Sequence, residues 1–171
     1  MPDTFYWDSC VFLAAVNGEP ERLQHIEAMM DAASKGEIVI LTSTLSKVEV
    51  AFGASEQQRQ ELDPRVEDRI DELWSTGSPV KLVEFHELLA DDARRLIRFA
   101  ITKGWSLRSA DAVHLATAMR HRADSYHTYD EKLPKYSGEI GITIEEPTAP
   151  APYLPLPPTQ PRPPDATTPR A

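Results

Sequence analysis

Short apolar runs alternate with longer stretches of mixed character along most of the chain. Four runs rich in β-branched and aromatic residues predict strands at 4–8, 38–41, 80–85 and 125–130, and a weaker run predicts a fifth at 140–145. Between them, apolar residues recur at spacings of three and four, as at Leu23, Ile26 and Met30, which indicates helices. The predicted helices cover residues 21–35, 45–52, 56–74, 89–103 and 109–119. Pro64 is expected at a first helical turn, where it divides the stretch 56–74 into two helices.

The order of these elements predicts an α/β fold. Strands that alternate with helices of 10 to 15 residues require right-handed crossovers, and these produce a parallel sheet with helices on its faces. The run at 38–41 is continuously apolar, as expected for a strand covered on both sides. Ligands of such sheets bind outside the carboxyl ends of the strands, so functional residues are sought there.

The prolines divide the chain into two parts. Residues 147–171 contain 10 of the 15 prolines and no glycine, whereas residues 1–146 contain all seven glycines. A segment so rich in proline favours an extended chain without a core. We therefore predict a folded domain at 1–146 and a disordered proline-rich tail at 147–171.

The charge of the domain limits its choice of partner. The chain has a net charge of -9 and the tail contributes +1, so the domain carries -10. Proteins that bind nucleic acid usually do so with an excess of Lys and Arg, so any action on RNA or DNA requires a local site.

The location of the protein is predicted to be cytoplasmic. The longest apolar run, residues 10–16, is far shorter than the roughly 20 residues of a membrane helix. The start, Met-Pro-Asp, lacks the positive charge that opens a secretory signal, and one cysteine cannot form a disulfide framework. We expect no contact with a membrane.

Four acidic residues occupy positions where chemistry is expected. Asp8 ends the first predicted strand, Asp130 ends the fourth, and Asp111 lies in the first turn of the helix that leads into the fourth. Glu49 lies on the apolar stripe of its predicted helix, where a carboxylate is costly unless it is paired or binds metal. The predicted topology brings all four to one edge of the sheet.

Each acid also has a purely structural interpretation. Asp111 suits the positive end of a helix dipole, Asp8 and Asp130 suit loops, and Glu49 could extend past the stripe or pair near Lys47. The grouping favours a metal site instead, because clustered carboxylates repel one another unless a cation lies between them. Oxygen ligands alone favour Mg²⁺ or Mn²⁺, which assist phosphodiester hydrolysis by activating water and neutralising charge.

The segments around these acids resemble a known family. They are WDSCVFL at 7–13, SKVEV at 46–50, SADAVHLATA at 109–118, and Thr128-Tyr129-Asp130. They are similar to the PIN-domain ribonucleases, and in particular to the VapC-type toxins of type II toxin-antitoxin systems. The resemblance covers about residues 3–146 and does not include the tail.

The resemblance implies a three-layer α/β/α sandwich with a central parallel sheet of four to five strands. It also implies endonucleolytic RNA cleavage with one or two Mg²⁺ or Mn²⁺ ions. Carried over by position, the catalytic and metal-binding residues are Asp8, Glu49, Asp111 and Asp130. Ser9 and Thr128 match small hydroxyl positions that help to hold the metal, its water or the neighbouring acids. Tyr129 departs from the family, which often has Asn there.

Further residues are candidates for binding partners. Residues 93–110 contain five basic residues and no acid, and among them Arg108, three residues before Asp111, is the best candidate for an RNA contact. His114 is interpreted as a packed residue rather than a general base. Residues 56–72 hold seven acids and three arginines. The resemblance implies that these early helices bind a cognate antitoxin and form a homodimer.

The leading hypothesis is therefore a metal-dependent endoribonuclease that acts as the toxin of a toxin-antitoxin pair. The alternative is a catalytically silent PIN fold that serves as a binding module. A phosphatase with Asp8 as nucleophile is disfavoured, because Cys10 stands where such enzymes generally have a second acid.

Overall fold

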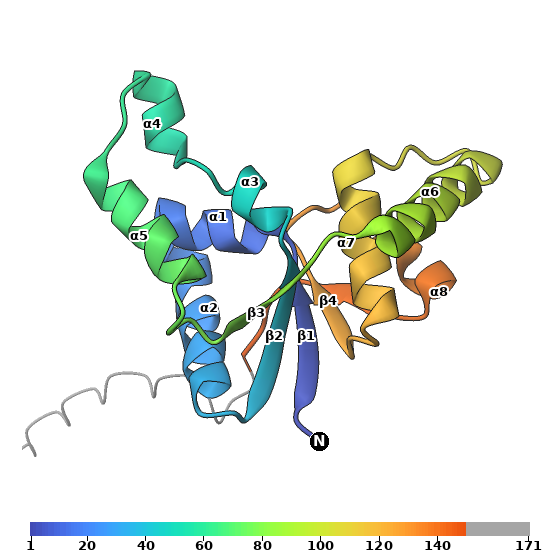
Figure 1. The fold of residues 1–171 in the computed structure, drawn as a ribbon, viewed down its shortest axis with the longest axis horizontal. Coiled ribbons are helices and arrows are strands. Elements are labelled where there is room, and N and C mark those ends of the chain that lie inside the picture. Colours follow the sequence, from blue (N-terminus) through green and yellow to red (C-terminus); the bar gives the residue numbers. More distant parts are fainter. Residues whose placement is uncertain (150–171) are drawn as a thin grey trace, which may run out of the picture.

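The computed structural model describes residues 1–149, which fold around a parallel five-stranded sheet of order β3-β2-β1-β4-β5 (Figure 1). The strands are β1 (Asp3–Trp7), β2 (Ile38–Ser43), β3 (Val80–Val83), β4 (Ser125–His127) and β5 (Thr143–Glu145). The parallel sheet and all five strands were predicted. Residues 150–171, most of the predicted tail, lie outside the described residues.

Strand β1 is the centre of the sheet and fixes where the site forms. Phe5 pairs with Ile40 of β2 on one side and with Ser125 of β4 on the other. Because all strands run in the same direction, the residues that follow β1, β2 and β4 meet at one edge, at the top of Figure 1. This edge is the carboxyl edge of the sheet.

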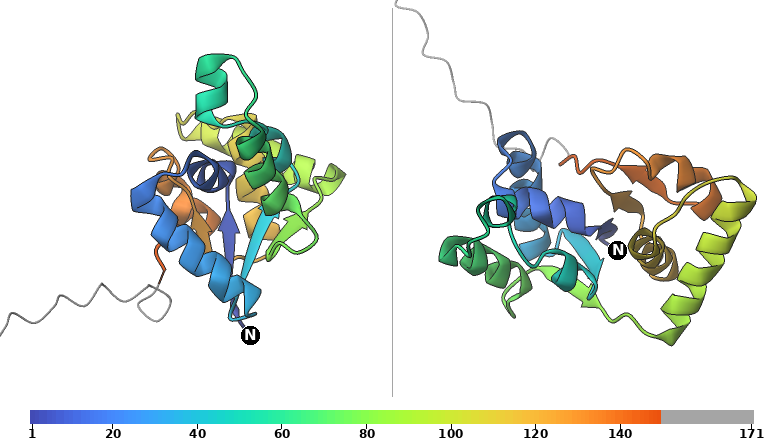
Figure 2. Two further views of the ribbon diagram at one scale, coloured as in Figure 1. Left: turned by 90° about the vertical axis from the view of Figure 1, so that its left-hand side faces the viewer. Right: turned by 90° about the horizontal axis from the view of Figure 1, so that it is seen from above.

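Helices cover both faces of the sheet, as predicted (Figure 2). The helices are α1 (Ser9–Asn17), α2 (Pro20–Ser34), α3 (Ser46–Glu49), α4 (Ala54–Arg59), α5 (Pro64–Trp74), α6 (Glu87–Thr102), α7 (Ser109–Arg120) and α8 (Ser137–Ile140), with a 3-10 turn at Pro134–Tyr136. Successive side chains of β1 point to opposite faces of the sheet and so belong to two separate cores. Tyr6 packs with α6 and α7, whereas Trp7 packs with α1, α2 and α5. The three-layer α/β/α sandwich is thereby confirmed.

Helix α1 was not among the predicted elements. Its residues form an apolar run in which Val11, Phe12, Ala14 and Val16 are all buried, so the run lacks the polar face that marks a surface helix. Asp8 caps this helix by accepting from the backbone N–H of Cys10.

The helix predicted at 45–52 is much shorter than expected. It forms the single turn α3, and the supposed stripe residue Val48 is 72% exposed, with Phe52 exposed as well. The backbone leaves the helix at Val50, whose side chain is fully buried. Burial of Val50 therefore replaces the predicted burial of Val48 and Phe52.

The charged stretch at 56–74 was correctly predicted as two helices divided at Pro64. Asp63 caps α5 by accepting from the N–H of Arg65, and Pro64 occupies the first helical position, where its missing N–H is not needed.

The chain still contacts the domain beyond the predicted boundary at residue 146. Pro147 and Ala149 are buried, and the Ala149 N–H donates to Nδ1 of His25 on α2 at 3.2 Å. Within residues 1–149, no helix combines the length and apolar character that a membrane span requires.

Candidate active site

Asp8 lies at the carboxyl edge between β1 and α1 and is almost fully buried, with 5% of its surface exposed. Its Oδ1 accepts from the N–H and the thiol of Cys10, and its Oδ2 accepts from the Thr128 hydroxyl at 2.6 Å. The Tyr126 hydroxyl approaches the same oxygen at 3.4 Å. Burial raises the pKa of Asp8, and the hydrogen bonds from Cys10 and Thr128 oppose this shift.

Thr128 connects two of the predicted acids. Its hydroxyl donates to Asp8 and accepts from the backbone N–H of Asp130 at 2.9 Å. One hydroxyl therefore positions the Asp8 carboxylate and the backbone of Asp130 together. Tyr129 takes no part in this contact, because its ring lies under the guanidinium of Arg22 at 3.8 Å.

Arg108 joins Asp111 to Asp130. Its Nε and Nη2 donate to the two oxygens of Asp111 at 2.7 and 3.0 Å, and the same Nη2 donates to Asp130 Oδ2 at 2.9 Å. Asp111 is in the first turn of α7, and Asp130 follows β4. The two carboxylates therefore converge on one cationic group, from two elements that are consecutive in the chain.

Glu49 finds its partner in His114. His114 Nε2 lies 2.6 Å from Glu49 Oε2, and its Nδ1 lies 2.7 Å from the Tyr6 hydroxyl. The Tyr6 hydroxyl also accepts from the backbone N–H of Ser43. The buried ring of His114 therefore links Glu49 to Tyr6 through its two nitrogens.

This partner preserves the charge of Glu49. Burial alone raises the pKa of Glu49, but the His114 hydrogen bond, the Ser9 hydroxyl and the charge of Arg108 together lower it below its ordinary value. His114 is itself buried, with 2% exposed, as the interpretation of a packed histidine expected. The pairing of Glu49 near Lys47 is not what the structure has.

All four predicted acids thus lie at one edge of the sheet. Asp8, Thr128, Asp130, Arg108 and Asp111 form a continuous chain of hydrogen bonds, and Glu49 adjoins it through Ser9 and the field of Arg108. Among residues 1–149, no three acidic, His or Cys side chains already surround a common metal position.

The donors nonetheless fit a hard cation. Mg²⁺ keeps several waters and is usually bound through only one or two carboxylates. Asp111 and Asp130 already face one positive group, and every candidate ligand supplies oxygen. Mg²⁺ or Mn²⁺ therefore suits this donor set better than zinc.

Sequence reasoning missed Cys10 as part of the site. The Cys10 thiol donates to Asp8 and accepts from the N–H of Tyr129 at 3.0 Å. Burial and the neighbouring Asp8 raise the pKa of this thiol, so it remains a protonated donor. The one sequence signal was its place two residues after the helix-capping Asp8.

The arginines of α6 and α7 differ in their contacts. Arg95 and Arg120 both pair with Asp92, which agrees with a structural interpretation of these two residues. Arg94 and Arg98 instead line a groove of about 280 Å³ between α6 and α7, together with Ser109. A cationic surface therefore begins beside the first turn of α7.

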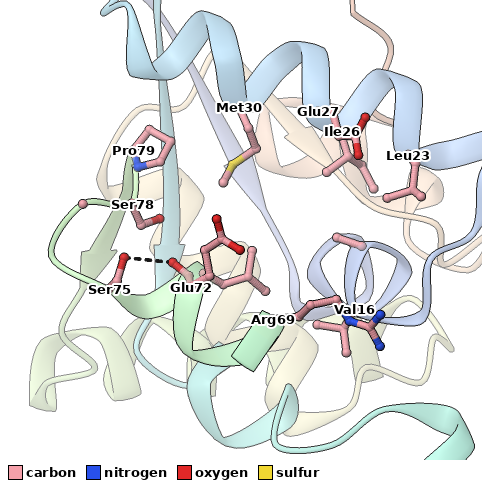
Figure 3. A pocket seen from close by; sticks show the side chains of 13 residues that line it. Val16, Leu23, Ile26, Glu27, Met30, Arg69, Glu72, Ser75, Ser78 and Pro79 are labelled. Carbon is pink, nitrogen blue, oxygen red and sulfur yellow. Dashed lines mark hydrogen bonds between the residues drawn. The ribbon is translucent and has the colours of Figure 1, made fainter. Parts of the chain in front are cut away.

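A larger groove, of about 550 Å³, lies away from the acids. It is bounded by α1, α2 and α5 and lined by apolar residues such as Leu23, Ile26, Met30 and Leu73 (Figure 3). Glu72 and Arg69 are the charged residues that α5 contributes to it. None of the four predicted site acids reaches this groove, so the candidate chemistry is on the open carboxyl edge.

Comparisons with known proteins place this arrangement in a family. The PIN domain family matches residues 5–139. VapBC2 from Rickettsia felis, solved with a DNA fragment of its promoter, is similar with a TM-score of 0.61 and 14% identity over 84% of this chain and 98% of that chain. For FitAcB from Neisseria gonorrhoeae the TM-score is 0.58 and the identity 16%, over 84% and 97%.

A third structure is VapC20 from Mycobacterium tuberculosis, described as a sarcin-ricin loop cleaving toxin. It has a TM-score of 0.53 and 14% identity over 74% of this chain and 90% of that chain. No curated protein sequence matches the chain significantly. Because the family match spans most of the domain and the fold recurs in these structures, the chain belongs to the PIN domain family.

Proposed function

We propose that the protein is a metal-dependent endoribonuclease and the toxin of a toxin-antitoxin pair. The observation that carries this proposal is the gathering of Asp8, Glu49, Asp111 and Asp130 at the carboxyl edge of a PIN-domain sheet. Four acids at one edge of an acidic protein favour a cation-dependent reaction on a phosphate substrate.

Each residue has a defined role in this proposal. Asp111 and Asp130 hold Mg²⁺ or Mn²⁺, with Asp8 and Glu49 beside them. When bound, the ion activates water and neutralises charge that develops on the phosphate. His114 keeps Glu49 ionised, and the small hydroxyl residues position the acids. Because acids occupy the metal site itself, RNA phosphates would be bound by cationic side chains beside it, including Arg108.

The proposed partner is a basic antitoxin. The structural relatives include VapBC2 and FitAcB, whose names denote toxin-antitoxin assemblies. On α4, α5 and the loop between them, five acids are exposed, namely Glu61, Glu67, Asp68, Asp71 and Glu72. Such a surface suits a partner rich in Lys and Arg. A homodimer and a cytoplasmic location belong to the same proposal.

Substitution of Asp111 and Asp130, which are partly exposed, tests the nuclease. Asp111→Asn and Asp130→Asn should each reduce RNA cleavage at least about 100-fold and abolish growth arrest on expression, because each removes a charged oxygen ligand. Cleavage of total RNA with Mg²⁺ and growth after induction are the measurements. These positions are better than Asp8, which also caps α1.

Glu131→Gln is the matched control, because Glu131 is exposed and adjacent to Asp130. It should cleave RNA and arrest growth like the unaltered protein. If folded Asp111→Asn and Asp130→Asn proteins remained as active as this control, the catalytic assignment would be wrong.

The silent binding module is the second candidate, and one observation favours it. Arg108 already pairs with both Asp111 and Asp130, so the acids have a structural role without metal. Calorimetric titration with Mn²⁺ distinguishes the two candidates. Binding that disappears in Asp111→Asn supports the nuclease, whereas the absence of such binding in the folded protein supports the module.

A further inference from the structure

Arg108 occupies the position of a cation between two of the proposed metal ligands. Arg108 donates hydrogen bonds to both oxygens of Asp111 and to one oxygen of Asp130, and all three are 3.0 Å or shorter. Charge-assisted bonds of this kind, with two donors from one guanidinium, are among the stronger hydrogen bonds in proteins. The backbone N–H of Lys132 donates to the other oxygen of Asp130.

The Arg108 side chain can leave this contact without disturbing the two acids. The Arg108 side chain is 71% exposed, whereas those of Asp111 and Asp130 are 16% and 24% exposed. Arg108 is the residue that precedes the first turn of α7, with an extended backbone. Its guanidinium can therefore move into solvent without leaving a cavity, while the acids keep their places on α7 and after β4.

We propose that Arg108 is a displaceable internal cation that competes with the divalent metal for Asp111 and Asp130. In the metal-free protein it holds the two carboxylates together and offsets their repulsion. Metal binding requires it to release both carboxylates, and the freed guanidinium then faces the substrate's phosphates. This inference rests on the proposed metal-dependent function, which it deepens by naming what the metal must displace.

The charges of the three groups show in which direction Arg108 changes the affinity for a divalent ion. With Arg108 in place the three groups carry a net charge of -1, and without it the two acids carry -2. The acids alone therefore attract a divalent ion more strongly. Arg108 contributes a full positive charge, because the guanidinium of arginine stays protonated in proteins.

Mn²⁺ binding by full-length variants tests the proposal without recourse to activity. Arg108→Gln should bind Mn²⁺ about three- to tenfold more tightly than the unaltered protein, the range expected from loss of two partly exposed ion pairs. Arg98→Gln is the control, because Arg98 is an exposed arginine of α6 and its loss changes the net charge equally. It should leave the affinity nearly unchanged.

A second measurement observes the displacement itself. The Nε–H of Arg108 should be protected from exchange in the NMR spectrum of the ¹⁵N-labelled metal-free protein, and its signal is identified by its absence in Arg108→Lys. Saturating Mg²⁺ should remove that protection. Arg108→Lys keeps the charge and loses the paired hydrogen bonds, so its Mn²⁺ affinity should lie between those of the other two proteins.

The outcomes separate two failures. If Mn²⁺ binding is lost in Asp111→Asn but Arg108→Gln binds no more tightly than the control, the competition is overturned and the metal site stands. If none of the folded proteins binds Mn²⁺ in a carboxylate-dependent manner, the proposed function fails and the competition fails with it.

Discussion

At the scale of single residues, the site depends on how each acid is partnered. Asp8 accepts hydrogen bonds from neutral donors, Glu49 pairs with a buried histidine, and Asp111 and Asp130 both contact the positively charged Arg108. Because these environments differ, the four acids of one cluster are not chemically equivalent. Asp8 has a raised pKa and Glu49 a lowered one.

His127, the last residue of β4, gives a prediction for the pH dependence of stability. Burial lowers its pKa from the ordinary 6.5 to about 4, and its Nδ1 accepts from Trp7 Nε1 at 3.1 Å. The unfolded chain therefore binds a proton at a pH where the folded protein does not, and stability falls as pH falls from 6.5 to about 4. The stability contribution is fully present above the ordinary pKa.

His127→Gln should lack this component. Between pH 7 and pH 4.5, the unaltered protein should lose about 2–3 kcal/mol more of its free energy of unfolding than the variant. Urea denaturation at both values, with a chelator present, measures the difference. Parallel losses in the two proteins would show that His127 is not held neutral.

At the scale of elements, α4 and α5 are joined by a buried acid outside the candidate site. Glu56 is buried, and its two carboxylate oxygens accept from the N–H groups of Gly53 and Asp63, at 2.9 and 2.6 Å. One side chain therefore satisfies the start of α4 and the residue that caps α5. The exposed acids of the proposed antitoxin surface lie in this turn and on α5.

Glu56→Ala should destabilise the protein by about 2 kcal/mol, because two backbone N–H groups lose their acceptor. Glu61→Ala, at an exposed position of the same turn, should change the free energy of unfolding by less than about 0.5 kcal/mol. Urea denaturation of both variants provides the comparison. Equal effects of the two substitutions would show that the two hydrogen bonds accepted by Glu56 do not stabilise the protein.

At the scale of the whole molecule, the domain and the proline-rich segment meet at α2. Ala149 is 2% exposed and belongs to the core beside Met29, and its N–H donates to His25. The composition placed the boundary at residue 146, and that boundary remains a prediction. Pro147 and Ala149, which lie beyond it, are nevertheless buried in the domain.

Two truncations follow from this packing. A chain that ends at residue 149 should keep the nuclease activity and the Tm of the full chain. A chain that ends at residue 146 should be less stable by about 1–2 kcal/mol, because it loses two buried residues and one hydrogen bond. Thermal unfolding and RNA cleavage test both truncated chains. Reduced activity of the chain that ends at residue 149 would assign a function to residues 150–171.

Local pattern explains what could be predicted. The sheet and most helices follow from periodicities of two and about 3.6 residues, which depend only on neighbours in the chain. The shared edge of Asp8, Asp111 and Asp130 follows from the rule that parallel strands end together. Among the elements that were misjudged, α1 and α3 have patterns set by distant contacts, since α1 is buried on several sides and α3 ends where Val50 enters the core.

The sequence by itself thus determined the layers of the fold and the edge at which its acids gather, because both depend on local periodicity and strand direction. Only the tertiary structure decided which groups contact those acids. Glu49 and His114 are 65 residues apart, and Thr128 and Asp8 are 120 apart. Such pairs form by proximity in space, and no spacing along the chain encodes them.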